Sequence, residues 1–377
     1  MPPKLLAHHW FFQPRGGERV LVELASLLPD APILTAFAAD GVAGWPKEIA
    51  ALRPRVRPSR LQSLFRAAER MPAFMPLLLP LLPWGMRGSF GRELAAAGHV
   101  VVSDAGLAKS LALETAAPVS VYLHSPMRHI WHDAEQTLAR LPAIARPAAD
   151  RMLARLRRID RESAARVGQW AVNSRTTADR AAVAYGLPRE RFTVIHPPVA
   201  VPEEPAEEGP RTGLLVVSGM EPYKNDLLAV QAAARLDRPL TVVGDGPERR
   251  RLERAAGPKT RFVGKVGDAD LDRLYRTHAL LLFCGVEDFG IVPVEAIARG
   301  CPVVALGTGG ATETIEPDTT GVLFAEPTVD AAIAAIEAAD EIAWNRSVMH
   351  ARTARFVPQR FRTEITCWLG IALPPGV

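Results

Sequence analysis

Two glutamates separated by seven residues carry the clearest chemical signal in the sequence. Glu287 and Glu295 lie within residues 284–300, a stretch that follows a short apolar run. Pro293 is well tolerated in the first turn of a helix, so the stretch predicts a loop that leads into a helix. Glu287 then belongs to the loop, and Glu295 lies about one turn inside the helix. Because a carboxylate can accept two hydrogen bonds from a vicinal diol, the two glutamates are suited to a sugar and a ribose.

The same loop-to-helix junction predicts an anion site made by the main chain. Unpaired amides and the helix dipole both favour a negative charge at a helix N-terminus. The amides expected to converge there belong to Phe289, Gly290, Ile291 and Val292. Spacing alone leaves a second interpretation open, in which Glu287 is a solvated loop residue and Glu295 is simply favoured by the helix dipole.

Two other junctions carry groups suited to a diphosphate. Lys224 follows an apolar run and precedes a helical pattern, so its ammonium would project over the strand ends, where a point charge can hold phosphate. Gly16 and Gly17 precede an amphipathic helix, and paired glycines let the backbone approach a phosphate closely. The alternatives are an exposed lysine in a turn and a plain glycine loop.

A histidine follows another apolar run. His124 comes directly after residues 119–123, where it either faces a ligand or makes a structural hydrogen bond. Arg128, His129 and Trp131 follow within a few residues and enrich the patch for contact with sugar or phosphate.

Other motifs argue against rival chemistries. The turn at Gly244 resembles a dinucleotide turn but lacks the full Gly-x-Gly-x-x-Gly pattern, so nicotinamide binding is poorly supported. Asp268 and Asp270 imitate a metal-binding Asp-x-Asp, but a helical pattern follows them, so we expect one of them to be its N-cap. We therefore expect no metal site. The sequence has no Ser-His-Asp order, Walker motif or His-Glu-x-x-His motif.

Short apolar runs that alternate with helical patterns must position these groups. The strands expected after residue 213 are 214–218, 240–243, 261–263, 279–283 and 302–305. The helices between and after them are 225–236, 247–256, 268–277 and 292–300. The first half repeats the theme with a helix over 17–28 and strands over 100–102, 119–123, 171–172 and 194–195. This alternation is typical of a doubly wound, parallel α/β sheet.

The length of 377 residues favours two domains. Residues 201–211 are acidic, rich in proline and have the composition of a linker. We therefore expect an N-terminal Rossmann-like domain over 1–200 and a second one over 201–355. The final segment, 356–377, contains a terminal helix over 361–369. Two such domains would face each other across a cleft and bind ligands at the carboxyl ends of their strands.

Composition and charge narrow the class of protein. Hydrophobic residues make up 48% and charged residues 23%, as in ordinary globular proteins. Three dispersed cysteines without a Cys-x-x-Cys pair favour neither a disulfide scaffold nor a cysteine zinc site, and they suit a reducing cytoplasm. We also expect neither a signal peptide nor a membrane-spanning segment, because the required apolar stretches are missing from the sequence.

The positive charge is concentrated in the first half. Residues 1–200 carry a net charge of about +10 and the remainder about −6. Such a basic half can face nucleic acid, an anionic lipid surface or a phosphorylated substrate. Nucleic acid is the least supported, because the basic runs contain no arrayed aromatics, zinc finger or basic coiled coil.

Segment 53–90 combines a basic stretch with an apolar one. Residues 53–70 contain six arginines and one acid, Glu69, and an apolar, proline-broken stretch follows over 74–84. The arginines are Arg53, Arg55, Arg57, Arg60, Arg66 and Arg70. This composition suits shallow insertion at an anionic membrane, so the cytoplasmic protein would contact the inner face of the plasma membrane. A helical hairpin buried against the N-terminal domain is the alternative.

Together these motifs resemble family 4 of the retaining glycosyltransferases, which have the GT-B fold. The resemblance covers nearly the whole chain and is strongest over 213–311. The stretch from Glu287 to Glu295 is similar to the family's Glu-(seven residues)-Glu motif, and residues 309–313 to its glycine-rich loop. The block 124–131, His-Ser-Pro-Met-Arg with the later Trp, is similar to a block of bacterial mannosyltransferases that build O-antigen and exopolysaccharide.

The resemblance implies a role for each candidate residue. Glu287 would bind the donor-sugar hydroxyls, Glu295 the ribose and Lys224 the diphosphate. Gly17 would let its loop close over that diphosphate, and His124 would contact the sugar near the reacting carbon. Further expected contacts come from the amides of 289–292, from Gly16, and from the base-framing residues Gly244 and Val266.

The implied activity is a metal-independent, retaining hexosyl transfer in surface polysaccharide synthesis. The donor would be GDP-mannose first and a UDP-sugar second, with a glycan or a lipid-diphosphate-linked acceptor. One residue departs from the family pattern. The family usually has an arginine five positions before the lysine that corresponds to Lys224, and this sequence has Gly219 there. Arg15 or Arg128 would then substitute for it, or the protein is a weak or inactive nucleotide-binding partner or scaffold. A sugar-nucleotide epimerase of the same fold is the other alternative.

Overall fold

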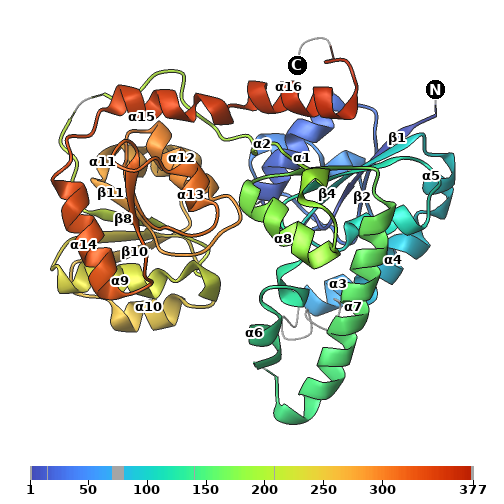
Figure 1. The fold of residues 1–377 in the computed structure, drawn as a ribbon, viewed down its shortest axis with the longest axis horizontal. Helices are drawn as coiled ribbons and strands as arrows, with labels where there is room; N and C mark the ends of the chain where they lie inside the picture. Colours follow the sequence, from blue (N-terminus) through green and yellow to red (C-terminus); the bar gives the residue numbers. More distant parts are fainter. Residues whose placement is uncertain (1, 15, 70–79, 140, 208, 375–377) are drawn as a thin grey trace. The chain divides into compact units, whose positions relative to one another are not determined.

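The computed structural model describes residues 2–14, 16–69, 80–139, 141–207 and 209–374, without the side chains of 67–69. The chain divides into two compact units (Figure 1). Unit 1 comprises residues 1–196 and 361–377, and unit 2 comprises residues 197–360.

Unit 1 is built on a parallel sheet of seven strands in the order β3-β2-β1-β4-β5-β6-β7. Its strands are β1 (Lys4–His8), β2 (Ile33–Thr35), β3 (Val56–Pro58), β4 (His99–Asp104), β5 (Val119–Leu123), β6 (Gln169–Val172) and β7 (Phe192–Val194). Its helices are α1 (Gly16–Leu27), α2 (Lys47–Ala50), α3 (Gln62–Glu69), α4 (Leu82–Ser89), α5 (Gly91–Ala96), α6 (Ala134–Ala139), α7 (Arg146–Arg166), α8 (Arg175–Tyr185) and α16 (Pro358–Leu369).

Both faces of this sheet are buried, because side chains alternate between them along each strand. Along β4, Val100 and Val102 pack into one apolar cluster and Val101 into the other. The second cluster also holds Phe361 and Ile365 from α16. The terminal helix predicted over 361–369 is therefore a structural part of unit 1.

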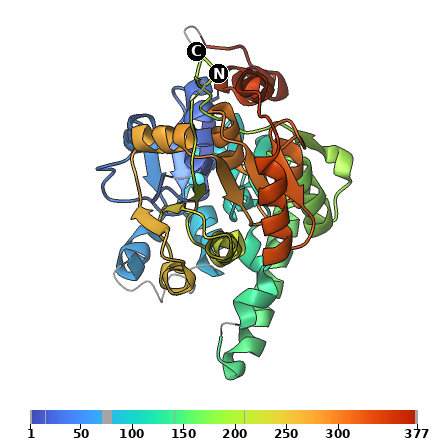
Figure 2. The same ribbon diagram turned by 90° about the vertical axis from the view of Figure 1, so that its left-hand side faces the viewer.

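Unit 2 contains a parallel sheet of six strands in the order β10-β9-β8-β11-β12-β13. Its strands are β8 (Leu214–Val217), β9 (Leu240–Val243), β10 (Thr260–Gly264), β11 (Leu280–Phe283), β12 (Val303–Leu306) and β13 (Gly321–Phe324). Its α-helices are α9 (Asp226–Arg235), α10 (Arg249–Ala255), α11 (Asp268–Thr277), α12 (Ile291–Ala298), α13 (Ala311–Thr314), α14 (Val329–Asp340) and α15 (Arg346–Thr353). Helices α9 and α14 share one apolar cluster, and α12 and α15 share another, so both faces are covered (Figure 2).

In each sheet the strand order reverses at one place. The reversal lies between β1 and β4 in unit 1 and between β8 and β11 in unit 2. In open parallel sheets, ligands bind outside the carboxyl ends of the strands at such a switch point. A ligand site is therefore expected among the residues that follow these four strands.

The doubly wound architecture confirms the predicted fold class. The boundaries expected at 200/201 and 355/356 lie at 196/197 and 360/361. Segment 201–211, a linker by composition, lies within unit 2, where Arg346 donates hydrogen bonds to the carbonyls of Glu207 (2.8 Å) and Gly209 (2.9 Å). Composition could not show this contact, since an arginine more than 130 residues away makes it.

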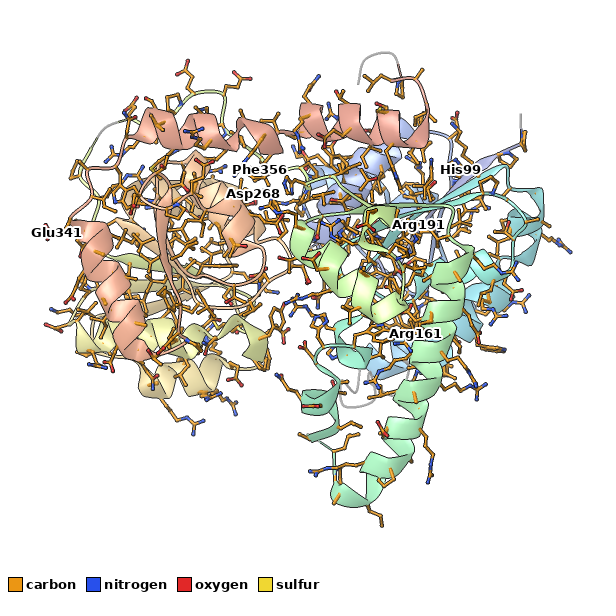
Figure 3. All side chains as sticks on the ribbon, in the orientation of Figure 1. His99, Arg161, Arg191, Asp268, Glu341 and Phe356 are labelled. Carbon is orange, nitrogen blue, oxygen red and sulfur yellow. The ribbon has the colours of Figure 1, made fainter. Side chains whose placement is uncertain are left out.

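The predicted capping role of Asp268 or Asp270 is wrong. The N-cap of α11 is Gly267, with no side-chain hydrogen bond, and Asp268 opens the helix (Figure 3). Asp270 instead pairs with Arg273, 2.9 Å away. Both acids still lie in the first turn, where the helix dipole favours negative charge.

Segment 53–90 is partly built into unit 1. Arg55 donates hydrogen bonds to the carbonyls of Ala25, Leu28 and Ala31 at 2.5–3.0 Å and so closes the C-terminal end of α1. Burial lowers the pKa of this guanidinium. Three more arginines of the basic stretch have protein partners, namely Arg53 with the Ala39 carbonyl, Arg57 with Glu93 and Arg66 with Asp40.

The apolar part of this segment is divided between the core and the surface. Leu82 and Met86 are buried, whereas Leu81 and Trp84 on the same stretch are exposed. Arg70 and residues 74–79 lie outside the described part of the chain. Within the described residues, no helix has both the length and the apolar character needed to cross a bilayer.

Candidate functional site

The switch point of unit 2 brings Lys224 and Glu287 into direct contact. Lys224 ends a short 3-10 helix, η7 (Pro222–Lys224), that follows β8, and Glu287 lies in the loop that follows β11. The Lys224 ammonium donates a hydrogen bond to Glu287 Oε1. Gly285 makes this contact possible, because a Cβ there would lie 2.7 Å from the Cα of Lys224. Any larger residue at position 285 would push the two loops apart.

The ion pair is poorly accessible to water. The side chains of Lys224 and Glu287 are 16% and 19% exposed. Burial alone would lower the pKa of Lys224, but Glu287, Tyr223 and Asp226 together raise the pKa above its ordinary value. Lys224 therefore stays cationic at neutral pH. A phosphate can accept hydrogen bonds from this ammonium in place of Glu287, and the released carboxylate can accept them from sugar hydroxyls.

A buried aspartate holds the loop that carries Lys224. Ser218 donates a hydrogen bond to Asp226 Oδ2 (2.6 Å), and its Oγ accepts one from the Met220 amide (2.9 Å). Burial raises the pKa of Asp226 to about 6, although the Ser218 bond and nearby Lys224 oppose the shift. Met220 and Asn225 both have φ near +50°, which is rare outside glycine and concentrates backbone strain in this loop.

Sequence reasoning missed Asp226. An aspartate in the first turn of a helix is common, and only the tertiary fold shows that this one is buried.

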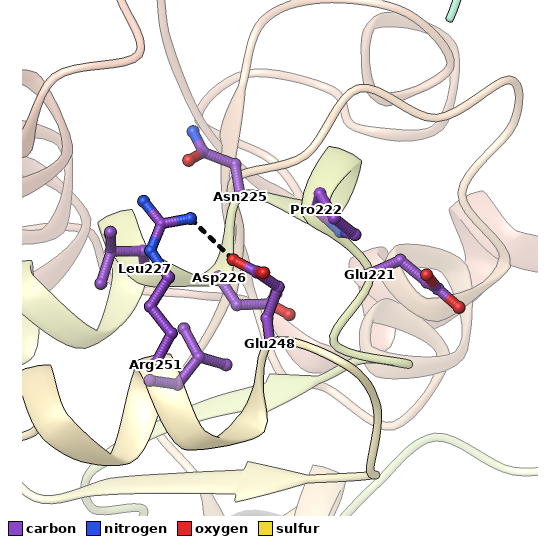
Figure 4. A pocket seen from close by; sticks show the side chains of 8 residues that line it. Glu221, Pro222, Asn225, Asp226, Leu227, Glu248 and Arg251 are labelled. Atoms are coloured by element: carbon purple, nitrogen blue, oxygen red, sulfur yellow. Dashed lines mark hydrogen bonds and ion pairs between the residues drawn. The ribbon is translucent and has the colours of Figure 1, made fainter. Parts of the chain in front are cut away.

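The pocket in Figure 4 lies between η7, α9 and α10. It is lined by Glu221, Pro222, Asn225, Asp226, Leu227, Glu248, Arg251 and Leu252. Its volume is about 40 Å³, and Arg251 pairs with Glu248 at its wall, 2.7 Å apart. Ligand pockets usually measure about 300–1,000 Å³, so this pocket is too small for a sugar or a nucleotide.

The loop after β12 supports Glu287 through the main chain. The Gly310 amide donates a hydrogen bond to the Glu287 carbonyl, 2.8 Å away. Gly309 has φ +70°, and a Cβ there would lie 2.5 Å from the same carbonyl. The predicted glycine-rich loop therefore packs directly against the backbone of Glu287.

The expected amide cluster lies at the start of α12, whose first residue is Ile291. Gly290 is the N-cap with φ +86°, a conformation that glycine adopts without strain. Residues 289–292 thus form the junction from loop to helix, as predicted from the sequence, with Phe289 buried.

Glu295 lies in the second turn of α12, where its surroundings are different. It is 7% exposed, and Tyr275 on α11 donates a hydrogen bond to its Oε2 (3.1 Å). Burial together with the adjacent Glu295 raises the pKa of Tyr275 well above its ordinary value, so Tyr275 remains a donor. The two motif glutamates therefore have different partners, Lys224 for Glu287 and Tyr275 for Glu295.

The remaining predicted residues of unit 2 border the same loops. Gly244 has φ +111°, and a Cβ there would lie 1.9 Å from the Ser218 carbonyl, so the turn after β9 packs on the loop after β8. Val266 is partly buried against the cluster that contains Val243 and Tyr275. At Gly219 a Cβ would meet only Glu221 Cγ, 4.0 Å away, so this position has room for a side chain.

The switch point of unit 1 gathers three histidines beneath the first turn of α1. Gly16 and Gly17 open this helix. A Cβ on Gly17 would lie 3.6 Å from Cε1 of His8 and of His9 and 3.8 Å from Nε2 of His124. The sequence predicted Gly17 and His124 as site residues, but not His8 or His9. Their signal was the pair of histidines at the end of the first apolar run.

A short chain of hydrogen bonds joins two of these histidines. His8 Nδ1 lies 3.0 Å from Ser103 Oγ, which lies 2.8 Å from His124 Nε2. Sheet register explains the contact, because His8 pairs with Ser103 across β1 and β4, and Ser103 with Tyr122 across β4 and β5. His124 follows β5, so parallel strands place all three groups at one edge.

The tryptophan of the predicted block 124–131 has a structural partner. Trp131 Nε1 donates a hydrogen bond to Asp160 on α7 (2.8 Å). Arg161, also on α7 (Figure 3), lies over the Trp131 ring with its guanidinium 5.0 Å from the centroid. Asp160 also pairs with the fully buried Lys109 (2.5 Å). Trp131 therefore anchors its loop to α7, which accounts for it without a sugar.

The two arginines considered as replacements at position 219 differ in what the structure shows. Arg128 lies 3.9 Å from Asp133, and its side chain is 18% exposed. Arg15 lies outside the described residues.

Two doubly wound units in one chain are typical of the GT-B fold, and solved structures with this fold match the chain over nearly its whole length. HepE of Anabaena, in complex with UDP and glucose, has a TM-score of 0.70 at 18% identity, with coverage of 98% of this chain and 99% of that chain. Sucrose-phosphate synthase from Thermosynechococcus elongatus has a TM-score of 0.69 at 15% identity, with 98% of both chains covered. At these identities the likeness concerns the fold alone.

The match to a family model lies within unit 2. Residues 201–349 match the family model of glycosyl transferases group 1. Glycogen synthase of Mycobacterium tuberculosis is 35% identical over 149 residues, 35% of this chain and 35% of that protein. D-inositol 3-phosphate glycosyltransferase of Salinispora tropica is 28% identical over 261 residues, 59% of this chain and 51% of that protein.

A shorter match also lies among the curated relatives. GDP-mannose-dependent alpha-mannosyltransferase of Mycobacterium tuberculosis is 37% identical over 98 residues, 26% of this chain and 25% of that protein. The matched part of the chain thus spans between a quarter and about half of the length of these relatives.

Proposed function

We propose that the protein is a glycosyltransferase that moves a hexose from a nucleotide diphosphate sugar to an acceptor hydroxyl with retention of configuration. The observation that carries this proposal is the half-buried pair of Lys224 and Glu287 at the switch point of unit 2. The pair lies within residues 201–349, which match the glycosyl transferases group 1 model.

The pair offers both kinds of contact that such a donor needs. When the bond between the anomeric carbon and the phosphate oxygen breaks, the electron pair goes to the leaving diphosphate. Lys224 and the amides that open α12 would stabilise that negative charge in a site with little water. Because these groups supply positive charge, the proposed reaction is metal-independent. Glu287 would hold the sugar by its hydroxyls, and Glu295 would bind the ribose.

The experiment is to measure release of the nucleoside diphosphate with and without a lipid-diphosphate-linked acceptor. Wild type should release it in an acceptor-dependent manner, and Lys224→Met should lose this turnover. Lys259→Met is the matched control, because Lys259 pairs with Asp237 on an exposed part of unit 2. Acceptor-independent conversion of the donor to another sugar nucleotide would instead identify an epimerase. The anomeric configuration of the product, read by NMR, tests retention.

For the donor we propose GDP-mannose first and a UDP-sugar second. The block at 124–131 supports mannose, as does the similarity to GDP-mannose-dependent alpha-mannosyltransferase. The fold of HepE, solved with UDP and with UDP-glucose, keeps UDP-sugars as the second choice. A thermal-shift series with GDP, UDP, ADP and their sugars tests the order, and a larger shift with UDP-glucose than with GDP-mannose would reverse it.

For the acceptor we propose a glycan or a lipid-linked diphosphate used in surface polysaccharide synthesis. The exposed Trp84 on α4, with Leu81 beside it and Leu64 on α3, gives segment 53–90 an apolar surface for shallow lipid contact. Trp84→Ser should reduce sedimentation with vesicles that contain anionic phospholipid. Ile144→Ser is the matched control, because Ile144 is exposed on η5 (Ala143–Ala145), outside that segment. Equal sedimentation of the Trp84 variant and wild type would reject the membrane contact.

A weak or inactive transferase is the second candidate, and Gly219 favours it. Loss of a bidentate phosphate contact costs on the order of 1.5–3 kcal/mol when the hydrogen bond is to a charged group. Donor binding by calorimetry without acceptor-dependent release would support this candidate over the active enzyme.

A further inference from the structure

The buried polar chain of unit 1 continues beyond His8 to a carboxylate. Glu18, in the first turn of α1, has its Oε1 3.6 Å from His8 Nε2. Both side chains are nearly inaccessible, at 0% for His8 and 3% for Glu18. The groups run in the order Glu18, His8, Ser103 and His124, with contacts of 3.6, 3.0 and 2.8 Å.

The carboxylate of Glu18 sets the donor-to-acceptor direction of these contacts. In a buried site, a carboxylate oxygen faces an N–H far more favourably than it faces a ring lone pair. His8 therefore carries its proton on Nε2, and its Nδ1 is an acceptor. Ser103 then donates its hydroxyl proton to His8 Nδ1, so its oxygen accepts from the Nε2–H of His124.

The neighbouring histidine, His9, has separate partners. Its Nδ1 faces two backbone groups, the Ala105 amide and the Ser103 carbonyl, each 3.3 Å away. Its ring centroid is 4.1 Å from that of His8, so the two rings pack together. The hydroxyl of Ser103 thus links His8 to His124 through two contacts that do not involve His9.

We propose that Glu18, His8 and Ser103 are positioning residues that fix His124 as the neutral tautomer with its proton on Nε2. Among these four residues, only His124 was predicted from the sequence as a candidate site residue. The effect on turnover rests on the proposed function, in which His124 contacts the donor sugar. The effect on the tautomer does not rest on it.

The direct test is the ring ¹⁵N spectrum of His124 in the full-length protein with labelled histidine, recorded near pH 8. The His124→Gln spectrum assigns the signal. We expect a protonated-type shift for Nε2 and an unprotonated-type shift for Nδ1 in wild type. Ser103→Ala should convert His124 to a mixture of tautomers, and Glu18→Gln should do so by removing the charge that sets the direction.

Two matched control variants distinguish the effect of the Glu18–His8–Ser103–His124 contacts from general effects of substitution. Ser110→Ala removes another buried hydroxyl of unit 1, and within the described residues its Oγ has no hydrogen-bond partner. Glu23→Gln removes a carboxylate from the same helix, where it pairs with Arg362 (2.6 Å). Neither control should change the His124 spectrum.

Several results would overturn the proposal. One is that the Ser103→Ala and Glu18→Gln proteins both fold and both keep the wild-type tautomer of His124. Another is that His124 in the wild-type protein carries its proton on Nδ1 alone, or is protonated on both nitrogens at pH 8. In turnover, Ser103→Ala should lower kcat on the order of tenfold, with the donor KM little changed. Absence of any turnover in wild type would reject the proposed function, while the spectra would still decide the tautomer.

Discussion

The hydroxyl of Tyr275 on α11 donates a hydrogen bond to the carboxylate of Glu295 on α12, 3.1 Å away. Tyr275 is 1% exposed and Glu295 is 7% exposed. A side chain on one helix thus sets the orientation of the carboxylate on the next. Glu287, in contrast, is held by the charge of Lys224. The two glutamates of the motif should therefore fail in different ways when they are replaced.

Glu295→Ala should weaken nucleotide binding about tenfold or more, because it removes a charged acceptor from the proposed ribose contact. Glu287→Ala should lower kcat on the order of a hundredfold and leave nucleotide affinity unchanged or higher, since Lys224 loses its competing partner. Calorimetric titration with the nucleoside diphosphate and steady-state kinetics check both. Equal loss of affinity in the two variants would contradict the assigned roles.

Gly219→Arg should increase affinity for a nucleoside diphosphate about tenfold. The position has room for a side chain, because a Cβ there meets only Glu221 Cγ at 4.0 Å. Affinity for the nucleoside without phosphates should not change, and Gly219→Gln should give little gain because it adds no charge. An arginine variant that binds the diphosphate no better than wild type would show that position 219 does not face the phosphates.

Asp226→Asn should stabilise the protein near neutral pH. Because burial raises the pKa of Asp226 to about 6, the folded state holds a proton that the unfolded state has already released above about pH 4. Stability contributed by this group is therefore full below pH 4 and is lost as the pH rises to about 6.

The gain from Asp226→Asn at pH 7 is about 1–3 kcal/mol and disappears at pH 4. Denaturant unfolding at both pH values measures it. Asp330→Asn is the matched control, because the side chain of Asp330 is 81% exposed in its pair with Arg235, and it should show no such difference. If the free energy of unfolding changed between pH 4 and pH 7 by the same amount in Asp226→Asn as in wild type, the raised pKa of Asp226 would be contradicted.

Arg55→Ala should lower the free energy of unfolding by about 2–4 kcal/mol, because it leaves the carbonyls at the end of α1 without their donors. Arg60→Ala, at an exposed position of the same basic stretch, should change stability by less than about 0.5 kcal/mol. Chemical unfolding compares them. Equal effects would mean that the Arg55 contacts carry no stability.

The central strands could be predicted from the sequence because they are buried on both faces and read as continuous apolar runs. Thus β9 lies over the predicted residues 240–243, and β11 differs by one residue from the predicted 279–283. Strands β2 and β3 have three residues each, and β13 is only half buried, so their patterns are too short or too mixed to be detected.

Some residues of the candidate site could likewise be predicted from the sequence, and others could not. Glu287, Lys224 and the residues that open α12 were predictable, because strand-to-helix junctions can be found along the chain. Ser103 and Tyr275 could not be predicted, because each acts through a partner brought close only by the sheet or by helix packing. Ser103 contacts His8, which lies 95 positions away in the sequence.

The return of the chain through α16 has a consequence for biosynthesis. Phe361 packs its ring against Tyr122, with centroids 5.6 Å apart, and Ile365 is fully buried among residues of α1 and β1. Translation delivers these side chains only after all of unit 2 has left the ribosome. Until then the nascent first unit lacks the apolar cover that α16 supplies, and apolar surface exposed in this way promotes aggregation during folding.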